Sequence, residues 1–171
     1  LAPLLSMGSI IVCATKGMER GTGNRMSQVL SEEVGEETLT RYCVLSGPNL
    51  SEEVAQGLPS TTVVAAKEED VVRGVQAAFT SRVFRVYTSA DVVGVEFGGA
   101  LKNIIAVGAG MADGMGYGDN GKAAFISRGI AEITRLGVAA GAEPLTFSGL
   151  ACLGDLVATC YSGLSRNRYV G

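Results

Sequence analysis

A lysine in an apolar segment is the residue of this sequence best suited to move a proton. Lys102 lies in the segment GGALKNIIAVGAG, between Leu101 and Ile104. Burial destabilises the charged form of an amine and lowers its pKa, so a buried lysine can accept and return a proton near neutral pH. Gly98 and Gly99, one turn earlier, allow another backbone or a ligand to approach closely. The residues alone leave two alternatives open, a catalytic lysine or one whose stem packs while its ammonium group reaches water.

A second group of polar residues suits a phosphate. Ser165, Arg166, Asn167 and Arg168 combine a hydroxyl, an amide and two guanidinium groups, and arginine offers paired N–H donors to phosphate oxygens. Taken alone, such a segment is more often a solvated basic loop. Asp155, in the segment LGDLVATC, is flanked by apolar residues, so it must either be paired or face a polar site.

Two further candidates follow apolar runs that resemble β-strands. Lys16 comes after the first run, and Gly47, in the turn Ser46-Gly47-Pro48, comes after the second. Ligands of open α/β sheets bind beyond the carboxyl ends of the strands. Together with Lys102 and the basic segment, these positions predict a cleft between an α/β domain and a helical one.

The first half of the sequence alternates between strand and helix patterns. Short β-rich runs over residues 9–14, 41–45, 61–66 and 84–88 predict four strands. Helices are predicted between them: one with Asn24 as its N-cap and Gly35 at its end, a short one from Ser51, and one over residues 68–79. This order favours right-handed crossover units and a mostly parallel sheet.

After Thr88 the pattern becomes helical. Ser89 or Asp91 can cap a helix that runs to about residue 111, and a glycine-rich loop over 114–121 follows. Asn120 can cap a second helix with apolar residues at helical spacing, and residues 150–161 form a third helical segment. We therefore predict two domains, residues 1–88 and residues 89–171.

The sequence contains one literal GxGxxG pattern, at residues 116–121. Such a loop cradles a pyrophosphate when it directly follows a strand and opens a helix. Here a helical pattern precedes it, and no acidic residue ends a strand about 20 residues later to bind a ribose. The context favours an interhelix loop over a phosphate loop.

Composition excludes several classes of function. The net charge of −3 disfavours nucleic acid as a partner, and 47% hydrophobic against 18% charged residues indicates a globular protein. Histidine is absent, which excludes imidazole catalysis and histidine metal ligands, and we predict no metal site. The four cysteines form no CxxC pair, so we expect buried free thiols and a reducing compartment.

The sequence shows no membrane or export signal. No run approaches the roughly 18 consecutive apolar residues of a membrane span, and no basic region followed by an apolar core marks a signal peptide. We expect a soluble protein without a membrane span. Because the sequence begins with Leu1 inside an apolar segment and stops at Gly171 after an arginine-rich stretch, we expect it to be part of a longer chain.

Several segments in order resemble the NAD(P)-dependent glycerol-3-phosphate dehydrogenases of the bacterial and plastid type. They are TKGMERGTG, VLSGPNLSEEVAQGLPS, FRVYTSADVVGVEFGGALKNIIAVGAGMADGMGYGDNGKAAFISRG and TFSGLACLGDLVATCYSGLSRNRYVG. The resemblance implies a Rossmann-type α/β domain, partial here, followed by an all-helical domain like that of 6-phosphogluconate dehydrogenase. It implies an oxidoreductase that interconverts sn-glycerol 3-phosphate and dihydroxyacetone phosphate with NAD or NADP and supplies phospholipid precursors. It also implies a homodimer in the cytoplasm or, alternatively, in the plastid stroma.

The resemblance also implies roles for individual residues. Lys102, in the LKN motif, would be the general base that takes the proton of the C2 hydroxyl. Ser51 would contact the cofactor. The implied substrate contacts are Lys16, Gly47, Asn49, Lys102, Asp155, Ser165, Arg166 and Asn167, of which Lys16 and Arg166 would also reach the cofactor. The family often has threonine or serine at the position of Asn49, and alanine at that of Ser51.

The sequence departs from the family at its start, because it lacks the strand–turn–helix GxGxxG that opens a Rossmann domain. We therefore expect little or no turnover from the 171-residue chain alone. The alternative is a truncated, catalytically silent module that keeps a phosphate-binding cleft or a dimer surface. Within the enzyme class, a related 3-hydroxyacid or sugar-phosphate dehydrogenase is a further possibility.

Overall fold

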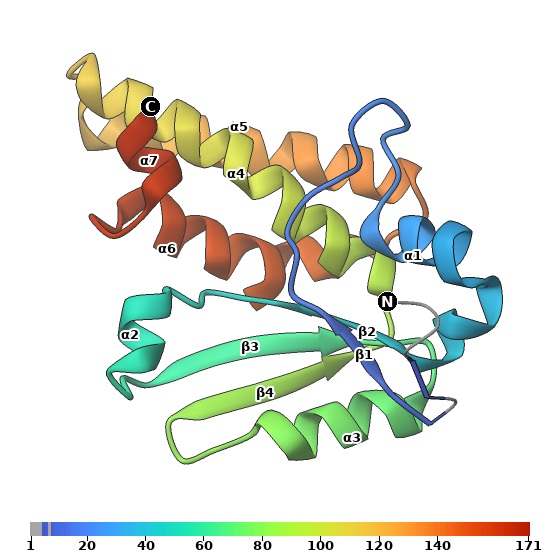
Figure 1. Ribbon diagram of the computed structural model, residues 1–171. Helices are drawn as coiled ribbons and strands as arrows, with labels where there is room; N and C mark the ends of the chain where they lie inside the picture. The colour runs from blue at the N-terminus through green and yellow to red at the C-terminus, as the bar shows by residue number, and fades with distance from the viewer. Residues whose placement is uncertain (1–4, 7) are drawn as a thin grey trace.

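A four-stranded sheet lies between a helix on one face and a layer of helices on the other (Figure 1). The computed structural model describes residues 5–6 and 8–171. Helix α3 (Glu69–Phe79) covers one face, while α4 (Val92–Gly114) and α6 (Asp155–Tyr161) lie over the other. The strands are β1 (Ile11–Cys13), β2 (Tyr42–Ser46), β3 (Ser60–Ala65) and β4 (Phe84–Ser89), all close to the four predicted runs.

The sheet is packed on both faces, which explains its continuous apolar runs. Successive residues of a strand point to opposite faces. In β2, Cys43 packs with Val72 and Val75 of α3, whereas Val44 packs with Val95 of α4. The strand therefore links the two layers and fixes the position of α4.

The strand order is β1-β2-β3-β4, with β1–β2 and β3–β4 parallel. The predicted crossover between the second and third strands is wrong, because β2 and β3 pair antiparallel. The connecting helix α2 (Ser51–Ala55) has five residues, so it rises only about 7.5 Å and cannot carry the chain back along the sheet. The chain therefore turns at the carboxyl end of β2, and β3 runs back.

Two of the predicted helix caps are wrong. Helix α1 (Met26–Val34) has Arg25 as its N-cap, while Asn24 donates from its side chain to Glu32. Helix α5 (Gly118–Ala139) begins after Tyr117, so Asn120 lies inside the helix and the loop before it is shorter than predicted. Gly116 and Gly118 have positive φ values of 71° and 70°, and they make the tight turn that starts α5 so early.

The other predicted boundaries are confirmed. Gly35 follows α1 with a φ of 105°. Of the two proposed caps of α4, Asp91 is the one used, because its side chain accepts a hydrogen bond from the backbone N–H of Gly94 at 2.8 Å. The division of the chain after residue 88 stays a prediction.

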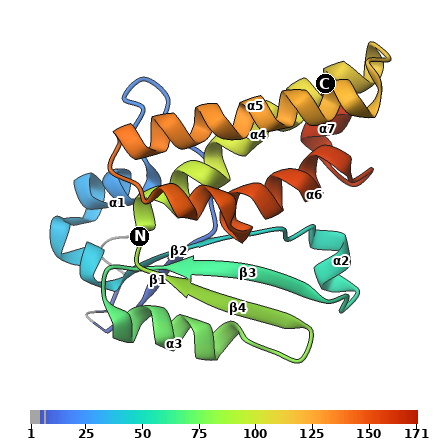
Figure 2. The ribbon, with the colours of Figure 1, turned by 180° about the vertical axis from the view of Figure 1, so that it is seen from behind.

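The second part of the chain is helical (Figure 2). Helices α4 and α5 pack as a hairpin, and the predicted face of α5 is confirmed by its buried Ile126 and Ile133. A 3-10 helix (Pro144–Ser148) and a π-helical turn (Leu150–Gly154) lead to α6, and α7 (Arg166–Val170) follows.

Helix α4 is long and apolar enough to cross a membrane, judged by length and composition alone. Half of its most apolar stretch is buried inside the protein, as in the core helix of a globular fold. Glycines bring it close to its neighbours. A Cβ at Gly98 would lie 2.9 Å from Cβ of Cys152, and one at Gly99 would lie 2.7 Å from Oγ of Ser46. The predicted close approach at these two glycines is therefore confirmed.

Candidate active site

Asp155 lies at the point where the two parts of the chain meet. It is the first residue of α6, and its side chain is 3% exposed. Its Oδ2 atom lies 2.6 Å from Nζ of Lys16, which follows β1, and its Oδ1 atom lies 2.5 Å from Nζ of Lys102 on α4. The predicted pairing of this acid is confirmed, and its partners are the two lysines that the sequence singled out.

Thr159 completes the Asp155 cluster, which consists of Lys16, Lys102, Asp155 and Thr159. Lys102 donates to Oγ1 of Thr159 at 2.7 Å, and that hydroxyl donates to the backbone carbonyl of Asp155 at 2.7 Å. An ammonium group has three N–H donors. Two of those of Lys102 are used within the cluster, which leaves one for a ligand.

The surroundings of Lys102 lower the pKa of its amine. The residue is 6% exposed, and burial lowers its pKa from the ordinary 10.5. The charge of Lys16 lowers it further, while the carboxylate of Asp155 acts in the opposite direction. Burial is the largest of these effects, so Lys102 gives up its proton more readily than an exposed lysine.

The carboxyl end of β2 holds Lys16 in place. The Lys16 ammonium donates to the backbone carbonyl of Gly47 at 2.9 Å. A Cβ at Gly47 would lie 2.8 Å from Cα of Thr62, so a glycine is needed where the chain passes β3. The two strand-end motifs predicted from the sequence therefore meet directly.

A cleft of about 560 Å³ opens beside the Asp155 cluster. It runs between the carboxyl end of β2, helix α2 and the connection from α6 to α7. Its lining residues are Lys16, Asn49, Leu50, Ser51, Glu52, Lys102, Asp155, Thr159, Leu164, Ser165, Arg166, Asn167 and Val170. The predicted cleft between the α/β and helical parts is confirmed. Gly47 does not line it but accepts a hydrogen bond from Lys16, which does.

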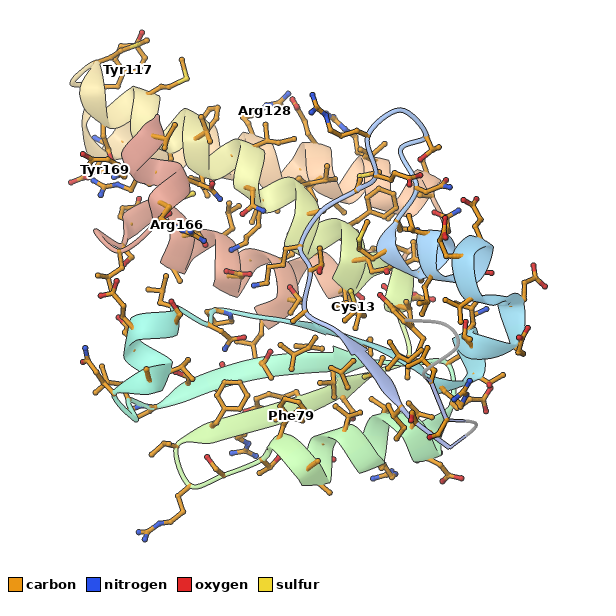
Figure 3. All side chains as sticks on the ribbon, in the orientation of Figure 1. Cys13, Phe79, Tyr117, Arg128, Arg166 and Tyr169 are labelled. Carbon is orange, nitrogen blue, oxygen red and sulfur yellow. The ribbon has the colours of Figure 1, made fainter. Side chains whose placement is uncertain are left out.

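The basic segment forms the start of α7. The Ser165 side chain caps this helix by accepting a hydrogen bond from the backbone N–H of Arg168 at 3.2 Å. Figure 3 shows Arg166 and Tyr169 on different sides of α7, and Arg166, although exposed, lines the cleft. Asn167 donates to the side-chain oxygen of Asn103, the residue after Lys102, at 2.8 Å. The segment is therefore part of the cleft wall and not a free loop.

The cleft suits an anion that also carries hydrogen-bond donors. Lys16, Lys102 and Arg166 supply positive charge. The Asn49 side chain donates to the carbonyl of Thr61 at 2.9 Å, which leaves its Oδ1 atom buried without a partner among the described residues. A buried acceptor of this kind needs a donor from a ligand or water.

These residues fit the reacting end of a nicotinamide dinucleotide next to a phosphorylated substrate. Ser51 and Arg166 line the same cleft as the amine of Lys102. The GxGxxG pattern of residues 116–121 spans the turn after α4 and the first residues of α5, outside the residues that line the cleft. It follows a helix and not a strand, as predicted, but the interhelix loop covers only residues 115–117. Within the described part of the chain, the strand–turn–helix loop that faces the cleft, from β2 to α2, does not carry the GxGxxG pattern that would hold the pyrophosphate.

The cysteines belong to the core. All four are free, as the sequence predicted; Cys43, Cys152 and Cys160 are buried, whereas Cys13 is only half-buried and departs from the prediction. Burial raises the pKa values of these three buried thiols, to about 11 for Cys43, about 12 for Cys152 and about 11 for Cys160. Such thiols stay protonated near neutral pH and are poor nucleophiles.

Sequence reasoning missed two residues of the site. Thr159 lies four residues after Asp155 on α6, a spacing that puts both side chains on one face, and this spacing could have identified it. Asn103 could have been found as the neighbour of Lys102 that supports Asn167.

Two models of one protein family match this chain. The N-terminal model of the NAD-dependent glycerol-3-phosphate dehydrogenases matches residues 1–72, and the C-terminal model of the same family matches residues 91–171. The chain belongs to this family. The predicted fold class, a partial Rossmann-type α/β domain followed by a helical domain, is confirmed by the same matches.

Curated relatives carry the same name. Glycerol-3-phosphate dehydrogenase [NAD(P)+] of Dehalococcoides mccartyi strain 195 is 54% identical over 170 residues, which cover 99% of this chain and 47% of that protein. The Moorella thermoacetica protein of the same name is 55% identical over 171 residues, 100% of this chain and 50% of that protein. The chain thus spans about half the length of the curated relatives it matches.

Solved structures agree with the fold. The crystal structure of glycerol-3-phosphate dehydrogenase from Coxiella burnetii matches with a TM-score of 0.91 and 37% identity, over 98% of this chain and 50% of that one. DsGPDH of Dunaliella salina matches with a TM-score of 0.88 and 32% identity, over 98% of this chain and 28% of that one.

Proposed function

We propose that the cleft belongs to an enzyme that interconverts sn-glycerol 3-phosphate and dihydroxyacetone phosphate by hydride transfer to and from NAD or NADP. One observation carries the proposal. The buried amine of Lys102 is held by Asp155 and Thr159 and opens into a cleft that Arg166 and Asn167 also line. A proton acceptor and a phosphate-binding pair thus lie in one cleft, as oxidation of a phosphorylated alcohol requires.

Lys102 moves the proton. In the oxidation, the neutral amine of Lys102 takes the proton of the C2 hydroxyl, the C2–H electron pair leaves as hydride, and the C2 carbonyl forms. In the reduction, the ammonium group returns that proton to the oxygen. NAD(P) supplies the hydride acceptor or donor, and Lys16, Ser51 and Arg166 are the residues that would hold it.

Asp155 keeps the two amines in place. Each of its oxygens accepts from one lysine, so both amines point toward the same end of the cleft. Its charge also stabilises Lys102 once the proton has been taken, which offsets part of the effect of burial.

The other end of the cleft binds the phosphate. Arg166 offers two parallel N–H donors, and the side chains of Ser165 and Asn167 complete the contacts. At the end of β2, Asn49 contributes a substrate contact and Gly47 acts by holding Lys16. This division separates the charged group of the substrate from the carbon that reacts.

The wider role follows from the family. We propose that the enzyme supplies glycerol 3-phosphate for phospholipid synthesis, acts in the cytoplasm and forms a homodimer. The apolar core, the free thiols and the half-buried helix α4 agree with a cytoplasmic protein.

One observation favours a second function for the 171-residue chain by itself. Its GxGxxG pattern lies at the turn from α4 into α5 and outside the residues that line the cleft, so this chain alone can keep the substrate half of the site without the dinucleotide half. The alternative is a catalytically silent module that binds the phosphorylated substrate or forms a dimer.

Isothermal titration of the 171-residue chain tests both proposals. We expect saturable binding of sn-glycerol 3-phosphate, much weaker binding of glycerol, and loss of the difference in Arg166→Ala. Equal affinity for the two alcohols would contradict the proposed site. Saturable micromolar binding of NADH would contradict the silent module, and turnover of dihydroxyacetone phosphate compared with other 2-oxo and 3-oxo acids separates this enzyme from related dehydrogenases.

A further inference from the structure

A second carboxylate joins helices at the far end of the helical part. Asp113, near the end of α4, lies 2.7 Å from Nζ of Lys122 through Oδ1 and 2.7 Å from Nε of Arg168 through Oδ2. Lys122 is 5% exposed, and its ammonium lies 4.4 Å from the ring centre of Tyr161. This Asp113 cluster, with Lys122, Tyr161 and Arg168, therefore connects α4, α5, α6 and α7.

Next to this cluster, the backbone of α7 packs against the backbone of α4. Gly110 is one turn before Asp113 on α4, and a Cβ at Gly110 would overlap the backbone carbonyl of Arg168. Helix α7 is thus close against α4 at the same residue whose side chain reaches Asp113. Arg168 is held from both its backbone and its side chain.

Helix α7 depends on such contacts for its position. It has five residues, and helices of this length are unstable in isolation. Its apolar residues contribute little burial, since Tyr169 is 87% and Val170 77% exposed. Polar and ionic contacts must therefore fix the helix, and Arg166 and Asn167 move with it.

We propose that Asp113 is a positioning residue for the phosphate end of the cleft. By binding Lys122 with one oxygen and Arg168 with the other, it holds α7 in the orientation that turns Arg166 and Asn167 into the cleft. The inference rests on the proposed function, because it assumes that these two residues bind the phosphate of the substrate. Asp113 does not itself line the cleft in the described part of the chain.

Charge alone predicts the opposite effect of a substitution. Asp113→Asn removes a negative charge from the neighbourhood of a phosphate site, which by Coulomb attraction strengthens anion binding. Loss of positioning weakens it. The sign of the change therefore separates a positioning role from a general electrostatic one.

The experiment is a double-mutant cycle on the 171-residue chain, with sn-glycerol 3-phosphate binding measured by isothermal titration. We expect Asp113→Asn to raise the Kd roughly 3- to 30-fold, the size of coupling found within one ion-pair network. In the Arg166→Ala background the same substitution should change the Kd little. Asp113→Glu should restore part of the affinity, and Glu132→Gln, which breaks an exposed pair on α5, is the matched control.

The outcomes are distinct. An unchanged or lower Kd in Asp113→Asn, or an equal loss with and without Arg166, overturns the inference and leaves the proposed function intact. A wild-type chain that does not prefer sn-glycerol 3-phosphate over glycerol overturns the proposed function itself. If Asp113→Asn does not fold, Arg168→Lys replaces it, because this variant keeps the charge but loses the Nε donor, and we expect the same weakening.

Discussion

Two buried carboxylates of this protein differ in what surrounds them. Asp155 and Glu96 have side chains that are 3% and 4% exposed, and each accepts several hydrogen bonds across the boundary between sheet and helices. Glu96, on α4, accepts from Arg25 at 2.6 Å, from Ser27 through its backbone and hydroxyl at 2.8 Å, and from Tyr42 at 2.7 Å. We call Arg25, Ser27, Tyr42 and Glu96 the Glu96 cluster.

The partners explain why one cluster is suited to chemistry and the other to structure. A guanidinium keeps its proton at any working pH, and burial together with Glu96 raises the pKa of Tyr42 well above its usual range. Tyr42 therefore keeps its proton near neutrality, and the hydrogen bonds of the Glu96 cluster fix α4 against α1 and β2. In the Asp155 cluster the partners are lysines beside a cleft. Arg25, Ser27 and Tyr42 also line a pocket, of about 390 Å³, so access to a ligand does not separate the two clusters. The type of partner does, and burial alone does not mark a functional carboxylate.

The largest effect is expected on turnover, from a substitution in the Asp155 cluster. Lys102→Met keeps the volume of the stem and removes the amine, so oxidation of sn-glycerol 3-phosphate by the whole enzyme should slow by about 10²- to 10⁴-fold. Lys102→Arg should fail nearly as badly, because its guanidinium cannot release a proton. Steady-state kinetics over a pH range measures this, and the limb that rises with pH should disappear.

The exposed Lys67 provides the control, and Lys67→Met should leave turnover unchanged. If Lys102→Met kept both the rate and the pH limb, proton transfer would have to be moved to Lys16.

A substitution in the Glu96 cluster should lower the stability of the fold. Glu96→Ala leaves Arg25 and Tyr42 without their buried partner, which should lower the free energy of unfolding by about 3 to 5 kcal/mol. Glu69→Ala is the matched control, since Glu69 also lies 2.6 Å from an arginine but is 73% exposed, and it should cost less than about 1 kcal/mol. Denaturant unfolding of both variants decides, and equal losses would show that burial of the Glu96 cluster contributes nothing.

A charge at the phosphate end should affect binding only. Arg166→Ala removes a paired charge-assisted contact, so binding of sn-glycerol 3-phosphate should weaken by on the order of 2 to 4 kcal/mol, while binding of glycerol changes much less. Arg128→Ala, on the outer side of α5 in Figure 3, removes the same charge from an exposed position and should have little effect. Calorimetric titration with both alcohols measures this, and a similar loss in the two variants would point to long-range charge in place of direct contact.

The smallest effect should come from the packing that supports the phosphate end. Gly110→Ala forces the backbone of α7 away from α4, which should cost about 1 to 3 kcal/mol of stability and weaken substrate binding. Gly114→Ala, on the same helix, meets nothing within 4 Å and should be neutral or slightly stabilising. Thermal unfolding with and without the ligand checks the pair, and tolerance of alanine at Gly110 would show that α7 can move without consequence.

Strand positions could be predicted from the sequence because each strand is a short β-rich run. Of these strands β2 is buried on both faces, whereas the edge strand β4 has Arg85, Tyr87 and Thr88 exposed. The direction of β3 could not, since it depends on α2 being too short to return the chain along the sheet. The start of α5 was missed because Gly116 and Gly118 make the turn and Asn120 does not cap the helix.

The candidate site shows the same limit. Lys102 and Asp155 could be singled out because charged groups stand out among apolar neighbours. Their pairing, and that of Lys16 with Asp155, joins positions 53 and 139 residues apart, and only the fold brings them together. Glu96 was not singled out, although it too lies among apolar residues, and its partners Arg25 and Tyr42 lie 71 and 54 residues away in the sequence.

The pKa of the Lys102 amine, measured by NMR titration of the 171-residue chain, tests most directly whether the Asp155 cluster holds a proton-transfer group. Burial predicts a value below the ordinary 10.5. Asp155→Asn should lower it further, because the charge of Asp155 raises it, whereas Glu96→Gln should leave it nearly unchanged. A value of 10.5 or higher in the wild type, or a rise in Asp155→Asn, would contradict the assignment of proton transfer to Lys102.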